Sequence, residues 1–263
     1  MYLLYCDETN FEKSPGDFFL YDGLIIPPDR AASLASSIAT IRSQLGVPRE
    51  YILKFNPGPA GFTHQQFILL KQQIIETAVA HGCHLLVSAL LHDIAVSSEE
   101  ARRFGINTLC YHFDCYLNRK QAPGVVLIDR FDDREIDNQL RERLAVGLTG
   151  RLPYSSEKAI ENIVGYHFTA IGTSHFCSLV DVVIGSLRFA INVHTRGNDA
   201  HFQSMSSILN LLAPLFFSES PGKVSEISLA LRPKEVRNGA YREKYQGLVA
   251  MLAEHNIVPA QPV

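Results

Sequence analysis

The order of the apolar segments constrains the fold of this chain most strongly. Two strand-like runs come first, at residues 2–6 and 18–26, and the polar stretch between them, which contains Gly16, is typical of a hairpin loop. After Pro27 and Pro28, which end the second run, helical and strand-like segments alternate along the chain. A hairpin combined with helical crossovers indicates an α/β fold whose mixed sheet contains antiparallel and parallel strands and is flanked by helices.

The spacing of apolar residues predicts the remaining elements. It indicates further strands at residues 84–91, 125–129, 163–171 and 226–231. It indicates helices at residues 29–45, 63–79, 97–117, 133–147, 174–192, 202–217 and 241–254. A loop rich in Pro and Gly, residues 48–63, carries Lys54. The polar stretch 195–199 separates a core, residues 1–195, from residues 196–263, which we expect to form a small α/β extension packed on that core.

Composition and charge exclude several classes of protein. With 46% hydrophobic residues, the chain is too apolar for the disordered class. Its 24 basic and 27 acidic residues leave a net charge of −3, so any nucleic-acid site is a local patch. We expect neither a membrane span nor a signal peptide, because the sequence shows no apolar run of ~18 residues and no basic leader. The five cysteines form no C-x-x-C pair, which predicts reduced thiols in a cytoplasmic protein.

Acidic residues occur at three places where an acid is locally unexpected. Asp7 and Glu8 follow the apolar run 2–6, Asp129 ends the strand 125–129, and Asp181 interrupts an apolar helix. Burying an ionised carboxylate costs several kcal/mol unless it is paired or binds a metal. Acids at strand ends of an α/β sheet lie where such sheets bind ligands. Asp7, Asp129 and Asp181 are therefore candidate ligands of Mg²⁺ or Mn²⁺, which prefer oxygen donors.

A structural interpretation of the same acids stays open. Asp7 and Asp129 would then cap turns, and Asp181 would form an ion pair with Arg188, two helical turns further along.

Motifs of other enzyme classes are missing from the sequence. Neither G-x-S-x-G nor a phosphate-binding glycine loop occurs, which argues against serine hydrolases, kinases, ATPases and dehydrogenases, and no zinc-ligand spacing is present. His175 is either a general base or phosphate contact near the acids, or a packing residue at a helix start. The basic stretch 223–244, with Tyr241 and Tyr245, is favoured as a solvated helix and turn over a base-stacking surface.

Four short segments, in order, resemble motifs of one protein family. They are YCDETN (5–10), ILKF (52–55), VLIDR (126–130) and LVDVVIG (179–185). They are similar to the D-E-S-G, E-L-K-F, V-I-D-R and Q-L-A-D-L-I-A-G motifs of the DUF3800 family, over residues 1 to about 195. The chain departs from these motifs at Thr9, Asn10, Ile52, Ser178 and Val180, and it keeps the carboxylates and the lysine.

The resemblance implies a ribonuclease H-like core and a Mg²⁺- or Mn²⁺-dependent nuclease or phosphodiesterase that acts on nucleic acid, in a setting such as prokaryotic defence or mobile elements. By this resemblance Asp7, Asp129 and Asp181 hold the metal, Glu8 is a ligand or a support for one, and Lys54 neutralises the scissile phosphate. The alternative is a catalytically silent interaction or regulatory module that retains the fold.

Overall fold

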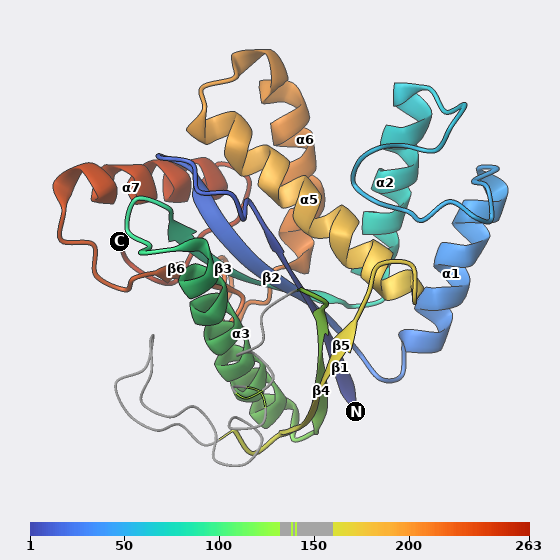
Figure 1. Cartoon of the computed structure of the whole chain (residues 1–263), viewed down its shortest axis with the longest axis horizontal. Coiled ribbons are helices and arrows are strands. Elements are labelled where there is room, and N and C mark those ends of the chain that lie inside the picture. Colours follow the sequence, from blue (N-terminus) through green and yellow to red (C-terminus); the bar gives the residue numbers. More distant parts are fainter. Residues whose placement is uncertain (132–137, 139, 141–159) are drawn as a thin grey trace.

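The computed structural model describes residues 1–131, 138, 140 and 160–263, and its framework is one six-stranded sheet (Figure 1). The strands are β1 (Tyr2–Thr9), β2 (Phe18–Ile26), β3 (His84–Leu91), β4 (Gly124–Asp129), β5 (Ile163–Thr169) and β6 (Leu229–Arg232). Their order is β5-β4-β1-β2-β3-β6. Among these strands β2 alone runs against the rest, since it pairs antiparallel with β1 and β3 while the other pairs are parallel. The predicted mixed α/β sheet is thereby confirmed.

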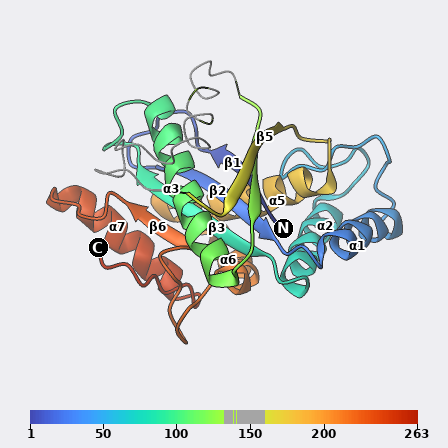
Figure 2. The ribbon, with the colours of Figure 1, turned by 90° about the horizontal axis from the view of Figure 1, so that it is seen from below.

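Helices cover both faces of this sheet. They are α1 (Ala31–Gln44), α2 (His64–Ala80), α3 (Ser98–Lys120), α5 (His175–Thr195), α6 (Phe202–Leu212) and α7 (Gly239–Ala253), with short 3₁₀ turns at Asp199–His201 and Ala213–Leu215. Within the described part of the chain, α3 packs on one face, and α5 crosses the other together with α1, α2, α6 and α7 (Figures 1 and 2). The period-2 alternation of β1 and β2 divides their side chains between these two cores.

Local sequence signals account for where several helices begin. Thr63 caps the start of α2: its hydroxyl accepts the Gln66 N–H, and the Gln66 side chain accepts the Thr63 N–H. The Ser97 hydroxyl caps α3 in the same way by accepting the Glu100 N–H. The predicted helix at residues 133–147 lies outside the described residues except for 138 and 140.

Several elements differ from their sequence-based boundaries. β1 continues to Thr9, so Asp7 and Glu8 lie inside the strand and not in a turn, because hairpin pairing with β2 extends to Thr9 opposite Leu20. The last strand starts at Leu229 and not at residue 226. The helix predicted at 202–217 ends at Leu212, and a 3₁₀ turn containing Pro214 follows it.

The C-terminal residues 196–263 are integrated into the same layers. β6 pairs in parallel with β3 and extends the main sheet, and α6 packs against α5. α5 is the one helix of the described chain with the length and composition of a membrane span, and 72% of its apolar window is buried inside the fold.

The contact between α3 and β2 gives a test of the packing. A Cβ at Gly105 would lie 2.3 Å from Cβ of the buried Tyr21, so Gly105→Ala should destabilise the fold by about 1–3 kcal/mol. In α7, a Cβ at Gly247 has its nearest neighbour at 3.4 Å, and Gly247→Ala should be neutral or stabilising by up to ~1 kcal/mol. Chemical denaturation of both variants measures the difference, and equal stabilities would contradict the α3–β2 packing.

Candidate active site

Four of the five predicted site residues line one cavity. Asp7 of β1, Lys54 of the loop before α2, Asp129 at the end of β4 and Asp181 of α5 surround a cavity of about 100 Å³. The rest of its lining comes from Tyr5, Cys6, Thr169, Ile171, Cys177 and Val180. Segments far apart in the sequence therefore bring three carboxylates and one amine to a single small space.

Sheet register explains why Asp7 and Asp129 meet. β1 and β4 are parallel neighbours, and their last paired residues are Cys6 and Ile128. Asp7 and Asp129 come directly after that pair, so both follow the same rung of the ladder. The two strands that carry these acids are therefore neighbours in the sheet.

Asp181 reaches the cavity from the helix above the sheet. Its Oδ2 accepts the backbone N–H of Phe55 at 2.5 Å, which ties the loop that carries Lys54 to α5. A Cβ at Gly185, one turn further along α5, would lie 2.5 Å from Cβ of Phe55, so only glycine allows this close approach. No ion pair joins Asp181 to Arg188, both of which lie in the described part of the chain. The alternative role of Asp181 in such a pair is therefore wrong.

Burial and the neighbouring negative charges both disfavour the ionised form of these carboxylates. The pKa of Asp7 is raised to about 8, mainly by burial and further by the negative charges of Asp129, Glu8 and Asp181. The Glu8 N–H, which donates to Asp7 Oδ1 at 2.8 Å, acts in the opposite direction and lowers this pKa. Burial and then Asp181 also raise the pKa of Asp129, while the Arg130 N–H and Lys54 oppose them. The pKa values of Asp7 and Asp129 therefore both lie above their ordinary values.

Glu8 lies on the other side of the sheet. Successive side chains of a strand point to opposite faces, so Glu8 faces α3 when Asp7 faces α5. There its Oε1 accepts from Arg102 Nη1 of α3 at 3.2 Å. Burial raises the pKa of Glu8 although Arg102 opposes the shift. The structure thus does not bring Glu8 into the cavity as a metal ligand, and leaves it as an ion-pair partner that packs β1 against α3.

Asp22 is the acidic neighbour that the sequence analysis missed. It lies directly opposite Asp7 in the β1–β2 pair, its side chain is fully buried, and neither carboxylate oxygen has a hydrogen-bond partner among the described residues. Burial, followed by the charge of Asp7, raises its pKa well above the ordinary value. An acid inside the apolar run 18–26 is the same signal that identified Asp181, so the sequence did contain it.

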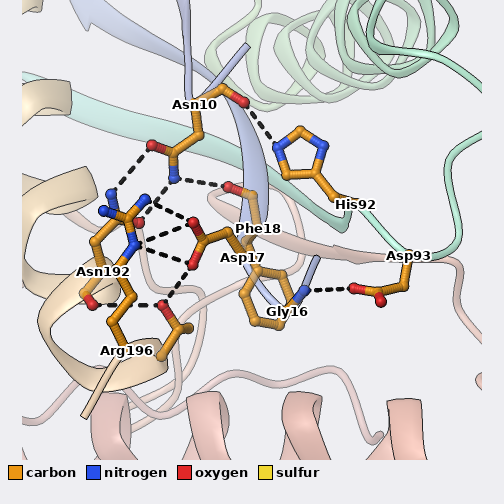
Figure 3. Close-up of polar contacts among 9 residues, drawn as sticks. Asn10, Gly16, Asp17, Phe18, His92, Asp93, Asn192 and Arg196 are labelled. Atoms are coloured by element: carbon orange, nitrogen blue, oxygen red, sulfur yellow. Dashed lines mark hydrogen bonds and ion pairs between the residues drawn. The ribbon is translucent and has the colours of Figure 1, made fainter. Parts of the chain in front are cut away.

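A polar network joins the C-terminal end of β1 to the C-terminal end of α5 (Figure 3). Asn10, at φ 57°, exchanges side-chain hydrogen bonds with Asn192 of α5 at 2.8 and 3.1 Å. Asp17 of the hairpin accepts from Arg196 Nη2 at 2.6 Å and from Thr195 at 3.1 Å. Because β1 carries Asp7 and α5 carries Asp181, these contacts hold the two carboxylates in a set relation.

The remaining candidates have structural surroundings. Tyr245 is fully buried and its hydroxyl donates to the Arg232 carbonyl. The alternative in which Tyr245 stacks on a base is therefore wrong. Arg232 is buried as well, and its guanidinium donates to Glu226 and His112 at 3.1 Å each. His175 is the first residue of α5 and does not line the cavity of Asp7, Asp129 and Asp181.

The donor set of the cavity fits Mg²⁺ or Mn²⁺. Asp7, Asp129 and Asp181 offer carboxylate oxygens, the donors that these ions prefer, and Lys54 is the one cation among the described residues of the lining. Asp181 uses one oxygen for the Phe55 N–H and keeps the other free for a ligand. Within the described residues, no group of three or more His, Cys, Asp or Glu side chains stands at metal-ligand spacing.

Comparisons with protein-family models, with curated proteins and with solved structures find no match to this chain. No family is shown. The resemblance to the DUF3800 family therefore depends on the four short motifs alone, and three of these motifs place a carboxylate at the cavity while the fourth places Lys54 there.

The raised pKa of Asp7 predicts a stabilising mutation in metal-free protein. A folded-state pKa of about 8 lies above the ordinary 3.8, so wild type loses stability as pH rises from about 4 to 8. Asp7→Asn removes this loss and should raise the melting temperature at pH 8 more than at pH 5, by ~2–4 °C per kcal/mol gained.

Thermal unfolding in EDTA at the two pH values measures this effect. Asp29→Asn, which changes a side chain that is 72% exposed, is the matched control and should shift the melting temperature little at either pH. A lower melting temperature for Asp7→Asn at pH 8 would mean that the charge of Asp7 supports the fold, as a turn cap does.

Proposed function

We propose that this chain is a Mg²⁺- or Mn²⁺-dependent nuclease or phosphodiesterase with a ribonuclease H-like core. The observation that carries the proposal is the convergence of Asp7, Asp129, Asp181 and Lys54 on one cavity of about 100 Å³. β1 lies inside the sheet, with antiparallel β2 on one side and parallel β4 on the other, which agrees with such a core. Nucleic acid is the proposed substrate class, and membership of the DUF3800 family is part of the proposal.

The carboxylates would hold the ion from two directions. Asp7 and Asp129 come from adjacent strands, and Asp181 comes from the helix that covers this face. A bound ion or ion pair supplies water activation and stabilisation of the leaving oxygen in phosphodiester hydrolysis. Its positive charge would also relieve the repulsion that raises the pKa of Asp7, so binding and ionisation of Asp7 favour each other.

Lys54 would orient the substrate. Its amine lies at the cavity beside the carboxylates, where a positive point charge can bind a non-bridging phosphate oxygen. The hydrogen bond from the Phe55 N–H to Asp181 fixes the adjoining backbone, and with it the start of the Lys54 side chain. Lys54 thus offsets part of the negative charge that would otherwise repel a phosphate from three acids.

The cellular setting of the protein is a further part of the proposal. The five cysteines, all in the described residues, are free thiols, as predicted for a cytoplasmic protein. A cytoplasmic location and a role in defence or mobile elements stay predictions.

Cleavage assays with Mg²⁺ or Mn²⁺ on single- and double-stranded DNA and RNA test the proposal. Asp7→Asn and Asp181→Asn should each lower the rate by more than about 100-fold, since even loss of groups that support a metal ligand costs ~10–100-fold. Lys54→Met should lower it less, by about 10–100-fold, because the metal site remains. Asp29→Asn is the control with an exposed acid and should keep the wild-type rate.

Metal-dependent cleavage that survives Asp7→Asn would contradict the assignment of the site. A wild-type protein that neither cleaves any of the four substrates nor binds Mn²⁺ would support the catalytically silent module.

A further inference from the structure

A second, larger cavity lies between α2, α5 and α6. Its volume is about 660 Å³, within the range of roughly 300–1,000 Å³ typical of small-molecule sites. Figure 1 shows these three helices on the same side of the sheet, with α5 between the other two. The cavity is lined by Phe55, Ile68, Lys71, Gln72, Ile75, Ser186, Gln203, Ser204, Ser207, Ile208, Asn210 and Leu211.

The lining of this cavity suits a planar ring with hydrogen-bonding groups at its edge. Aliphatic side chains come from both facing helices, Ile68 and Ile75 from α2 and Ile208 and Leu211 from α6. Amides from the same two helices, among them Gln203, add groups that both donate and accept hydrogen bonds. Nucleobases present this combination of apolar faces and donor-acceptor edges.

The charge of the lining favours an anionic or neutral ligand. Among the described residues of the lining, Lys71 is the one ionisable side chain and no carboxylate occurs. Lys71 Nζ lies 4.2 Å from the centre of the Phe55 ring and 4.5 Å from that of Phe67, so aromatic rings hold the amine in place. A cationic peptide finds no acidic partner here, whereas a nucleotide finds a positive charge beside a partly apolar slot.

The cavity adjoins the acidic site through Phe55. Its backbone N–H donates to Asp181 of the acidic cavity, and its side chain lines the larger cavity. Gly185, one turn after Asp181 on α5, packs against the Phe55 side chain, since a Cβ there would lie 2.5 Å from Cβ of Phe55. Phe55 therefore forms a boundary between the two cavities, and a phosphate at Asp181 and a base against the Phe55 side chain would be the two ends of one nucleotide.

We propose that the cavity between α2, α5 and α6 binds the nucleobase adjacent to the scissile phosphate. This inference rests on the proposed nuclease function. The acidic cavity would cleave the phosphodiester, and the larger cavity would recognise the strand by one of its bases. Base contacts of this kind favour substrates with an unstacked base, so single-stranded nucleic acid is the substrate class it selects.

Fluorescence anisotropy with two labelled probes tests the base site. The probes are a single-stranded pentathymidylate and an abasic pentamer with the same phosphates, with a uridylate pentamer as the RNA arm. They are titrated with Asp7→Asn protein in Mg²⁺, so that no probe is cleaved. The base-containing probes should bind about tenfold or more tighter than the abasic one, because one stacked base contributes ~1–3 kcal/mol.

Ser207→Trp, added to Asp7→Asn, fills the cavity from α6. It should reduce binding of the base-containing probes to the level of the abasic probe. Ser36→Trp, the same change at an exposed position of α1, is the matched control and should preserve the discrimination. Equal binding of base-containing and abasic probes, discrimination that persists in Ser207→Trp, or no binding of any probe would overturn the proposal.

The binding and cleavage experiments distinguish the proposed base site from the proposed nuclease function. Cleavage of nucleic acid without discrimination between the probes leaves the function standing and removes the base site. Discrimination by a protein that cleaves no substrate supports the base site and removes the function.

Discussion

The mutual repulsion of Asp7, Asp129 and Asp181 has to be overcome by the rest of the structure, because three carboxylates share a small, largely buried cavity with a single lysine. A protein selected for stability alone would replace such a cluster with apolar residues of similar size. The fold instead keeps the acids together, and burial with like charge raises the pKa of Asp7 to about 8. Under the proposed function, a divalent cation would be the partner that turns this unfavourable arrangement into a favourable one.

The surrounding structure is built to tolerate that repulsion. Strands β1, β2 and β3 form a continuous antiparallel unit, buried throughout β2 and half-buried along β1, and α5 lies across it with an apolar stripe. The Asn10–Asn192 and Asp17–Arg196 contacts tie the hairpin to the end of α5 (Figure 3). The acids therefore meet in a frame whose stability comes from packing elsewhere, and local repulsion does not separate β1 from α5.

How far the sequence predicts this site differs from residue to residue. Asp7 and Asp129 were predictable because parallel strands that end in acids bring those acids to one edge of a sheet. Asp181 was predictable because an acid on an apolar helix needs a partner. The meeting of Phe55 with Asp181 was not, since a backbone N–H in an irregular loop has no sequence signature, and 126 residues separate the two groups.

The errors also have physical causes. Glu8 was grouped with Asp7 by its neighbouring position, whereas the alternation of β1 sends it to Arg102 on the other face. Asp22 was overlooked because its strand is otherwise apolar, although that is what makes its carboxylate unusual. The pairing of β6 with β3 joins residues more than 130 positions apart, and local periodicity carries no information about such a partner.

Anomalous diffraction from a crystal soaked in Mn²⁺ tests the central claim most directly. The account predicts an anomalous peak in the cavity of Asp7, Asp129 and Asp181, within about 2.0–2.4 Å of oxygens from at least two of these carboxylates, and no such peak in Asp7→Asn crystals. An empty cavity in wild-type crystals at millimolar Mn²⁺, with the three carboxylates turned toward solvent or other side chains, would contradict it.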